Sequence, residues 1–184
     1  MPITTARSTC PAALTSAVRA AVGAGGAASD VATRVAAALA RHLPTPGQLL
    51  TGTQLAGDAA GYQTHPVHVE PDGSFSIAVM VWRPGQVTPI HDHVSWCVTG
   101  VLQGVEYEEI FGLGPDGGTL SELIRRENAP GTVAGFAPPG DIHRVRNSGD
   151  GVAVSMHVYG ADLARLGSSI RRVYDLPVEV PAPS

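Results

Sequence analysis

Lysine is absent from this chain of 184 residues, whose twelve basic residues are all arginine. No basic run occurs, and the formal net charge is −4 at pH 7, which argues against nucleic acid as the main partner. The chain also lacks any stretch that approaches the roughly 18 apolar residues of a membrane-spanning helix. Its first residues, MPITTARST, lack the apolar stretch of a signal peptide. We therefore expect a cytoplasmic protein with no nucleic acid and no membrane as partner.

Cysteine is scarce as well, with Cys10 in a polar start and Cys97 in an apolar run. Two cysteines so far apart and in such unlike contexts do not predict a disulfide framework. Charged residues make up 15% of the chain and hydrophobic residues 43%, so the chain can bury a core and is not a disordered polymer. The length fits one domain with a short appendage.

Residues 11–43 are predicted to be helical in two pieces, separated by the glycine-rich stretch 23–26. The second piece has Ser29 or Asp30 as a candidate N-cap, apolar residues at a spacing of four, and Pro44 just after its end. We expect the two helices to form a hairpin that packs on one face of the main body.

From residue 62 onward the sequence changes to short runs rich in Val, Ile and Thr, separated by Gly, Pro and Asp. Many short strands at regular spacing are typical of an all-β barrel of the jelly-roll type. The predicted strands are 62–70, 75–83, 97–110, 119–126, 132–136, 142–147 and 152–159. The predicted organisation is a helical segment (1–60), a barrel (61–176) and a proline-rich, loose or wrapping tail (177–184).

The first of two histidine clusters reads Gly85-x5-His91-x-His93-x3-Cys97-x6-Gly104. Residues i and i+2 of a strand point to the same face, so His91 and His93 can reach one ion from the interior of a barrel. Taken alone, such a pair is also compatible with two histidines that simply decorate a strand face.

The second cluster, PPGDIHRVRN at residues 138–147, delivers His143 at the start of a strand after a proline-glycine turn. Together, the clusters resemble the two motifs of the cupin superfamily, in matching order and nearly matching spacing. The resemblance implies a cupin barrel and a metal ion that is bound by His91, His93 and His143.

Typical metal cupins carry a glutamate between the histidines and the glycine of the first motif, and this chain has Cys97 there. Three neutral imidazoles without a carboxylate leave an iron site with more positive charge and more open positions, which suits a thiolate and O2. From Tyr62 to Tyr159 the chain resembles the cysteine dioxygenases and the related mercaptopropionate dioxygenases, which this substitution separates from most cupins. The resemblance implies Fe(II) as the cofactor, with nickel or cobalt as alternatives.

The resemblance includes a three-residue signature, Ser155-x-His157-x-Tyr159. Strand alternation puts the three side chains on one face, where Ser155 can bond His157 and His157 can orient the Tyr159 hydroxyl. In the family this row lies beside the iron, which implies catalytic roles; the alternative for His157 is a satisfied core histidine. For Cys97 two possibilities stay open, a thioether with Tyr159 or a small buried apolar residue.

The discriminating position of the family follows the tyrosine that matches Tyr62, and this chain has Thr64 there instead of arginine or glutamine. A threonine hydroxyl cannot replace a bidentate, charge-assisted contact to a carboxylate. Three interpretations remain open: Gln63 takes over, the carboxylate is held from elsewhere, or the substrate differs. For the second interpretation the candidates are Arg171 and Arg172, or Arg165 in their place, and the alternative for all three is a place on a solvated helix face.

These features predict an iron-dependent thiol dioxygenase that oxidises the sulfur of cysteine, or of a close carboxylated analogue, with O2 to the sulfinate. One alternative is a biosynthetic variant that gives a different sulfur-oxygenated product. The other is a non-catalytic cupin that binds a metal or a small ligand, against which the ordered serine-histidine-tyrosine row argues. The expected partners are the small thiol and O2, in a monomer or a small homo-oligomer.

Overall fold

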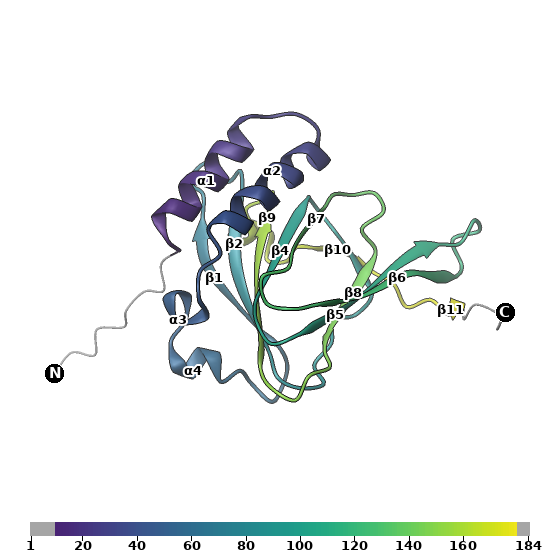
Figure 1. The fold of residues 1–184 in the computed structure, drawn as a ribbon. Coiled ribbons are helices and arrows are strands. Elements are labelled where there is room, and N and C mark those ends of the chain that lie inside the picture. The colour runs from purple at the N-terminus through teal and green to yellow at the C-terminus, as the bar shows by residue number, and fades with distance from the viewer. Residues whose placement is uncertain (1–9, 180–184) are drawn as a thin grey trace.

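The computed structural model describes residues 10–179, in which helices precede two β-sheets (Figure 1). Two longer helices and two single turns come first: α1 (Ala12–Gly23), α2 (Ala28–Arg41), α3 (Pro46–Leu49) and α4 (Gly52–Leu55). One more turn, α5 (Leu163–Leu166), follows the ninth strand. Within the described residues, no helix has the length and the apolar character that crossing a membrane requires.

Two sheets face each other and curl around a common interior (Figure 1). The first sheet contains, in spatial order, β1 (Gln63–Val69), β2 (Ser76–Trp82), β9 (Ala153–Tyr159), β4 (Cys97–Gln103) and β7 (Val133–Phe136). The second contains β10 (Ile170–Val173), β3 (His91–His93), β8 (His143–Asn147), β5 (Glu106–Leu113), β6 (Leu120–Asn128) and β11 (Val178–Glu179). Neighbouring strands are antiparallel, except that β11 runs parallel to β6. The predicted all-β barrel with N-terminal helices is confirmed.

Helices α1 and α2 form the predicted hairpin, which covers the outer face of the five-stranded sheet (Figure 1). Glycines on β7 and β4 allow the close contact. A Cβ atom on Gly135 would lie 3.1 Å from the carbonyl oxygen of Ala32, and one on Gly100 would lie 3.1 Å from Leu39 Cδ2. Apolar side chains of the two helices are fully buried in this contact: Leu14, Val18, Val35 and Leu39.

The start of α2 differs from the sequence prediction. Its N-cap is Ala27, and no side chain caps it, so the prediction of a cap by Ser29 or Asp30 is wrong. Asp30 instead lies in the first turn, where a carboxylate interacts favourably with the positive end of the helix dipole. The helix ends at Arg41, before Pro44, as expected.

The predicted strand 97–110 is in fact two strands, because the chain turns at Gly104. This glycine has a φ of +70°, and a Cβ atom on it would lie 2.7 Å from the Cα atom of Ala153. Both the left-handed backbone and the close approach require a residue without a side chain. The turn brings β5 into the second sheet, opposite β4.

Two short strands, β10 and β11, were not predicted from the sequence, and β3 was expected only as the strand that carries His91 and His93. Arg171 and Arg172 therefore lie on a strand rather than on a helix. Of the predicted tail, Val178 and Glu179 pair with β6, and 180–184 lie outside the described residues.

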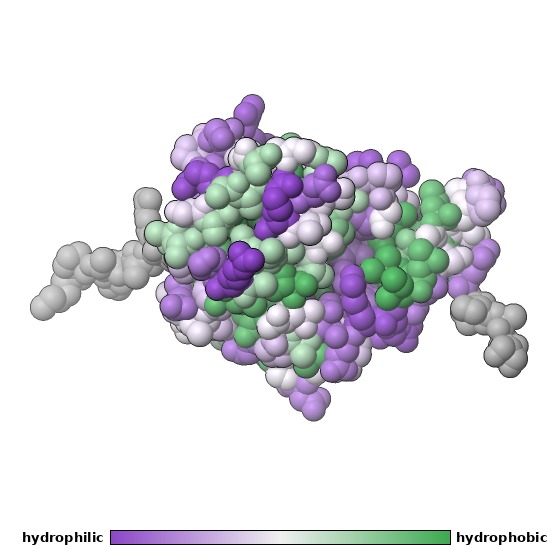
Figure 2. Space-filling model, turned by 45° about the horizontal axis from the view of Figure 1, so that its top comes forward, coloured by the Kyte–Doolittle hydropathy of each residue, from purple (hydrophilic) through white to green (hydrophobic). Residues whose placement is uncertain are grey.

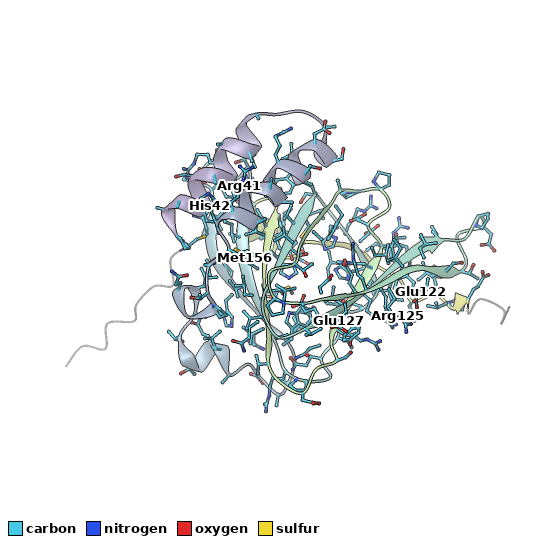
Figure 3. The ribbon with its side chains drawn as sticks, viewed as in Figure 1. Arg41, His42, Glu122, Arg125, Glu127 and Met156 are labelled. Atoms are coloured by element: carbon cyan, nitrogen blue, oxygen red, sulfur yellow. The ribbon has the colours of Figure 1, made fainter. Side chains whose placement is uncertain are left out.

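Strands β2 and β9 lie inside the five-stranded sheet, and all their residues are buried. Alternate residues face the helices; Met156 on β9 is one of them (Figure 3). The remaining residues of β9 face the interior of the barrel, and among these are Ser155, His157 and Tyr159. Strand alternation thus places apolar side chains on the helix side and a polar row on the interior side.

The outer half of the β5–β6 hairpin projects from the barrel (Figure 1). Glu122 and Arg125 form a 2.7 Å ion pair there (Figure 3). Hydrophobic residues gather on the same side of the molecule (Figure 2), and the hairpin exposes Leu113 and Leu123. The inner half of β5, in contrast, carries buried carboxylates into the barrel.

Candidate metal centre and cavity

The three predicted ligands lie together in the barrel. His91 and His93 point to one side of β3, and His91 is the register partner of His143 on β8. One nitrogen from each ring lies within 4.8 Å of the others, and each residue is at most 5% exposed. Strand alternation and one antiparallel pairing are therefore enough to make three imidazoles converge.

Each imidazole is oriented by an oxygen at its Nδ1 atom. The contacts are His91 to the Pro89 carbonyl oxygen at 2.9 Å, His93 to Asp141 at 3.2 Å, and His143 to Glu108 at 2.8 Å. A proton on Nδ1 leaves the Nε2 lone pair free for a metal. Burial lowers the pKa of His91 to about 3 and also lowers the pKa of His93, so both rings are neutral at pH 7. Three converging Nε2 atoms, each with an oxygen at the opposite ring nitrogen, fit a divalent transition metal.

Glu108 and Asp141 are partners of the ligands that the sequence alone does not predict. Burial alone raises the pKa of Glu108, but the hydrogen bond and charge of His143 and the charge of Arg126 lower it to about 2. Arg126 Nε donates to Glu108 at 2.8 Å. The carboxylate is therefore ionised and holds the ligand ring. The signal that could have found it is the spacing of Glu106 and Glu108, which places both on one face of a strand.

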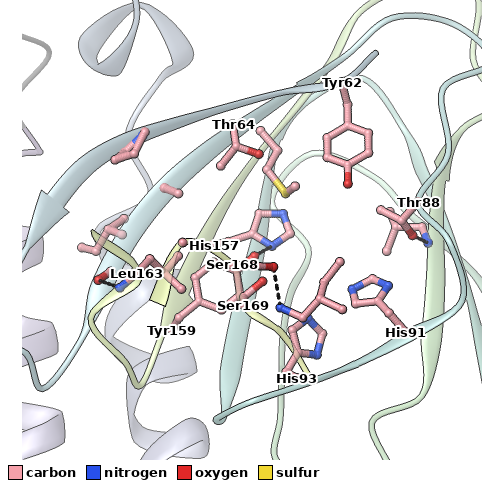
Figure 4. A pocket seen from close by; sticks show the side chains of 18 of the residues that line it. Tyr62, Thr64, Thr88, His91, His93, His157, Tyr159, Leu163, Ser168 and Ser169 are labelled. Atoms are coloured by element: carbon pink, nitrogen blue, oxygen red, sulfur yellow. Dashed lines mark hydrogen bonds between the residues drawn. The ribbon is translucent and has the colours of Figure 1, made fainter. Parts of the chain in front are cut away.

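The predicted serine-histidine-tyrosine row is present beside the histidines (Figure 4). The Ser155 hydroxyl lies 2.9 Å from His157 Nε2, and the Tyr159 hydroxyl lies 3.2 Å from His157 Nδ1. The Trp82 indole N–H donates to Ser155 at 3.2 Å. Burial lowers the pKa of His157 to about 3 and raises the pKa of Tyr159, so both are neutral. The Tyr159 and His93 ring centroids are 6.1 Å apart, which places the phenol next to the candidate ligands.

A cavity of about 330 Å³ opens in front of these groups (Figure 4). The three candidate ligands, His157 and Tyr159 line one end. Within the described part of the chain, no carboxylate or guanidinium lines the cavity. Its other polar walls are hydroxyl groups: Tyr62, Thr64, Ser76, Thr88, Ser168 and Ser169. The cavity therefore offers neutral hydrogen-bonding groups, in addition to the candidate ligands, His157 and Tyr159.

The residues proposed for substrate binding divide into two groups. Tyr62 and Thr64 line the cavity, and the Tyr62 ring stacks against Trp82 with centroids 4.6 Å apart. Gln63 lies between them on the strand, does not line the cavity, and donates from its side chain to the Gly61 carbonyl oxygen at 3.2 Å. Strand alternation explains why Gln63 does not replace Thr64.

Arg171 and Arg172 do not line the cavity either, although the sequence made them candidates for carboxylate binding. Arg171 pairs with the buried carboxylate of Asp92, and the Arg172 guanidinium lies 5.4 Å from the centroid of the Tyr174 ring. Of β10 only Ile170 lines the cavity, and an irregularity in the strand register between Ile170 and Arg172 interrupts the alternation that would place Arg172 on the same face. Asp92, between the two ligands of β3, thus fastens β10 to β3, away from the candidate metal centre.

Cys97 is the register partner of Tyr159 on the neighbouring strand β4. It is fully buried, and burial raises the pKa of its thiol. A hydrogen bond between thiol and phenol contributes to the pKa shifts of both groups. The two residues are therefore neighbours, as a thioether requires, and the packing role is equally satisfied.

Comparison with known proteins gives a family and a set of fold relatives. The model of the family "Cysteine dioxygenase type I" matches residues 56–168. A cupin superfamily protein from Desulfitobacterium hafniense is 12% identical with a TM-score of 0.47, over 65% of this chain and 90% of that chain. A cupin 2 conserved barrel domain protein from Salinispora arenicola is 21% identical with a TM-score of 0.42, and the match covers 58% of this chain and 82% of that chain. The strand order and the family match identify the fold as the cupin barrel that the sequence predicted.

Proposed function

This chain belongs to the cysteine dioxygenase type I family, and from that premise we propose that it is an iron-dependent thiol dioxygenase. The reaction joins a small thiol and O2 to give a sulfinate. The observation that carries the proposal is the set of three buried, converging histidines, without a carboxylate among the ligand atoms, that shares a cavity with the Tyr159 phenol. Such a set suits a substrate that itself binds as an anion.

The metal ligands in this proposal are His91, His93 and His143, and the metal is Fe(II), with nickel or cobalt as alternatives. Ferrous iron held there would supply a positive charge that favours a thiolate, and an open position for O2. Asp141 and Glu108 keep the rings of His93 and His143 in the tautomer that binds metal.

The chain's own groups then orient the substrate. His157 holds the Tyr159 hydroxyl at the metal end of the cavity, where it can hydrogen-bond the sulfur or the oxygen that adds to it. The buried walls of β2 and β9 keep bulk water from this end. Cys97 packs against Tyr159 from the neighbouring strand and limits the movement of the ring.

We propose cysteine or a close carboxylated analogue as the substrate. Its polar end would meet the hydroxyls of Tyr62 and Thr64, together with those of Ser168 and Ser169, rather than an arginine. A cavity of about 330 Å³ suits a molecule of this size. Because hydroxyls recognise a carboxylate less strongly than a guanidinium does, we expect broad selectivity among small thiols.

The test is anaerobic loading with Fe(II), followed by an oxygen-uptake screen over cysteine, mercaptopropionate, cysteamine and mercaptosuccinate. We expect uptake with at least one of these thiols, and no uptake by the His93→Ala variant. Metal-loaded protein that consumes no oxygen with any thiol would contradict the proposal and favour a binding protein.

A second candidate is a biosynthetic variant that gives a different sulfur-oxygenated product from the same groups. The observation in its favour is Thr64, a cavity residue at the position where the resembling dioxygenases have arginine or glutamine. Mass spectrometry of the product from the same screen separates the two candidates, because a sulfinate contains both atoms of one O2.

A further inference from the structure

Strand β5 carries a second buried carboxyl group that the chemistry above does not use. Glu106 is two residues from Glu108, so both side chains point into the barrel. Glu108 meets His143, whereas Glu106 is 3% exposed and its Oε1 atom has no hydrogen-bond partner among the described residues. A buried carboxyl oxygen without a partner is costly and calls for a role.

Glu106 neighbours Ser155, at the end of the serine-histidine-tyrosine row opposite Tyr159, and does not line the cavity. Burial raises the pKa of Glu106 to about 7, although the neighbouring polar groups of Ser155 and Trp82 act in the opposite direction. The carboxyl group can therefore exchange a proton near neutral pH. It neighbours Ser155, from which the hydrogen bonds of the row lead to the Tyr159 hydroxyl in the cavity.

Few charged groups surround this carboxyl. Glu108 on its own strand raises the pKa of Glu106 further. His157 on β9, one hydroxyl away, stays neutral because burial lowers its pKa to about 3. The register partners on β6 and β8 are Asn128 and Asn147, which carry no charge. Whether the Glu106 carboxyl group is protonated therefore depends mainly on its burial and on the hydrogen bonds of the row.

The hydrogen bonds of the row determine how a proton can pass. Ser155 Oγ accepts a hydrogen bond from the indole N–H of Trp82, a group that can only donate. When Tyr159 donates to His157 Nδ1, the proton on Nε2 points to Ser155. The remaining hydrogen of Ser155 is then available to Glu106. The reverse arrangement, with Glu106 protonated and every bond turned around, satisfies the same groups.

Resting on the proposed function, we infer that Glu106 is the buried end of a proton relay that begins at Tyr159 and accepts the proton of the substrate thiol. The S–H bond breaks and its proton passes to the phenol oxygen. Each member hands its own hydrogen to the next, and the last one forms the O–H bond of the Glu106 carboxylic acid. The sulfur becomes a thiolate, His157 changes tautomer but not charge, and no electron is transferred.

The experiment is infrared difference spectroscopy of the Fe(II)-loaded protein without oxygen, before and after addition of cysteine or mercaptopropionate at about pH 7.5. We expect a new C=O band of a protonated carboxyl group, which shifts in D2O. The band should be absent from Glu106→Gln and from Ser155→Ala, which interrupts the relay but keeps the carboxyl group. It should persist in Glu109→Gln, a buried glutamate of the same strand that pairs with Arg144 on the other face.

A second readout is the pH profile of oxygen uptake. Wild-type kcat/KM should rise through about pH 7 as Glu106 becomes able to accept a proton. The Glu106→Gln variant should lack this rise, and its kcat/KM at higher pH should be roughly 100-fold below that of the wild type. The profile of Glu109→Gln should match the wild type. A thiol that binds and is oxidised without the carboxyl band, or a band that persists in Glu106→Gln, would overturn the relay alone. Absence of thiol oxidation by wild-type protein that shows the band would overturn the proposed function alone.

Discussion

Three oxygen atoms decide what the histidines of the centre can do. Because the Pro89 carbonyl and two carboxylates each face an Nδ1 atom, all three rings keep a free Nε2 atom. An imidazole held the other way would direct an N–H group at the ion and could not bind it. Single side chains outside the cavity thus control the function of those inside it.

Removing one ligand should remove the metal. We expect His91→Ala, His93→Ala and His143→Ala each to reduce the bound divalent metal from about one per chain to a small fraction, because two imidazoles remain. Metal analysis after dialysis measures this. His68→Ala serves as the control, since His68 lies outside the centre and bonds Glu70. Full metal retention by all three variants would refute the ligand assignment.

The Tyr159 hydroxyl should matter for chemistry more than for metal binding. We predict that Tyr159→Phe keeps its iron and loses roughly 10- to 1,000-fold in turnover, a barrier change of about 1.4 to 4 kcal/mol. Tyr107→Phe is the matched control, because this tyrosine lies on the outside of β5 and bonds Glu127. Wild-type turnover by Tyr159→Phe at full iron content would exclude the phenol from the reaction.

At the scale of elements, alternation along a strand made part of the site predictable. The patterns of residues 91–93 and 155–159 indicated which side chains share a face, and the structure places them so. The contribution of β5 was not predictable, because it depends on the pairing of Ile110 with His143, and these residues lie far apart in the sequence. Likewise, only the pairing of β10 with β3 shows that Arg171 meets Asp92 rather than the cavity.

The carboxylate that β5 provides should tune the affinity for metal. We expect Glu108→Gln to weaken metal binding by roughly 10- to 100-fold, because an amide supports the imidazole of His143 less well than a carboxylate. Competition with a chromophoric chelator gives the affinity. The control is Glu122→Gln, a partly exposed glutamate on the neighbouring strand that pairs with Arg125. Equal affinities of Glu108→Gln and the control would show that β5 only supports the barrel.

For the whole molecule, the fold class and the helical hairpin followed from composition and periodicity, while the contents of the cavity did not. No arginine lines the described walls of the cavity, and this depends on the direction in which each of several strand residues points. In the sequence, only Thr64 indicated that the usual arginine is missing. The helix cap at Ala27 was hidden for a similar reason, since packing on the sheet rather than a side-chain cap sets where α2 begins.

Buried neutral histidines should make the metal-free protein sensitive to acid. Burial lowers the pKa of His91 and of His157 to about 3, against an ordinary value of about 6.5. Below pH 6.5 the unfolded chain therefore binds protons that the folded chain does not, and stability falls as the pH falls. Each histidine contributes up to about 1.4 kcal/mol per pH unit in this window. Glu106, whose pKa burial raises, acts in the opposite direction, but it is one group against His91, His93 and His157.

Urea unfolding of the metal-free protein at about pH 7.5, 6 and 5 measures this dependence. We expect the urea concentration at the midpoint of unfolding to decrease steadily as the pH is lowered from about 7.5 to 5. His157→Asn removes one of these titrating rings, so its midpoint should fall less steeply than that of the wild type. A wild-type midpoint that is constant over this range would mean that these histidines are not buried and neutral.

The most direct test of the account is one turnover experiment with ¹⁸O-labelled O2. Fe(II)-loaded protein is mixed with the best thiol from the screen. The mass of the product is measured by mass spectrometry while oxygen consumption is recorded. We predict one O2 consumed per thiol and a sulfinate that contains two labelled oxygen atoms. A disulfide, or a product whose oxygen comes from water, would contradict the claim that the cavity adds O2 to the sulfur.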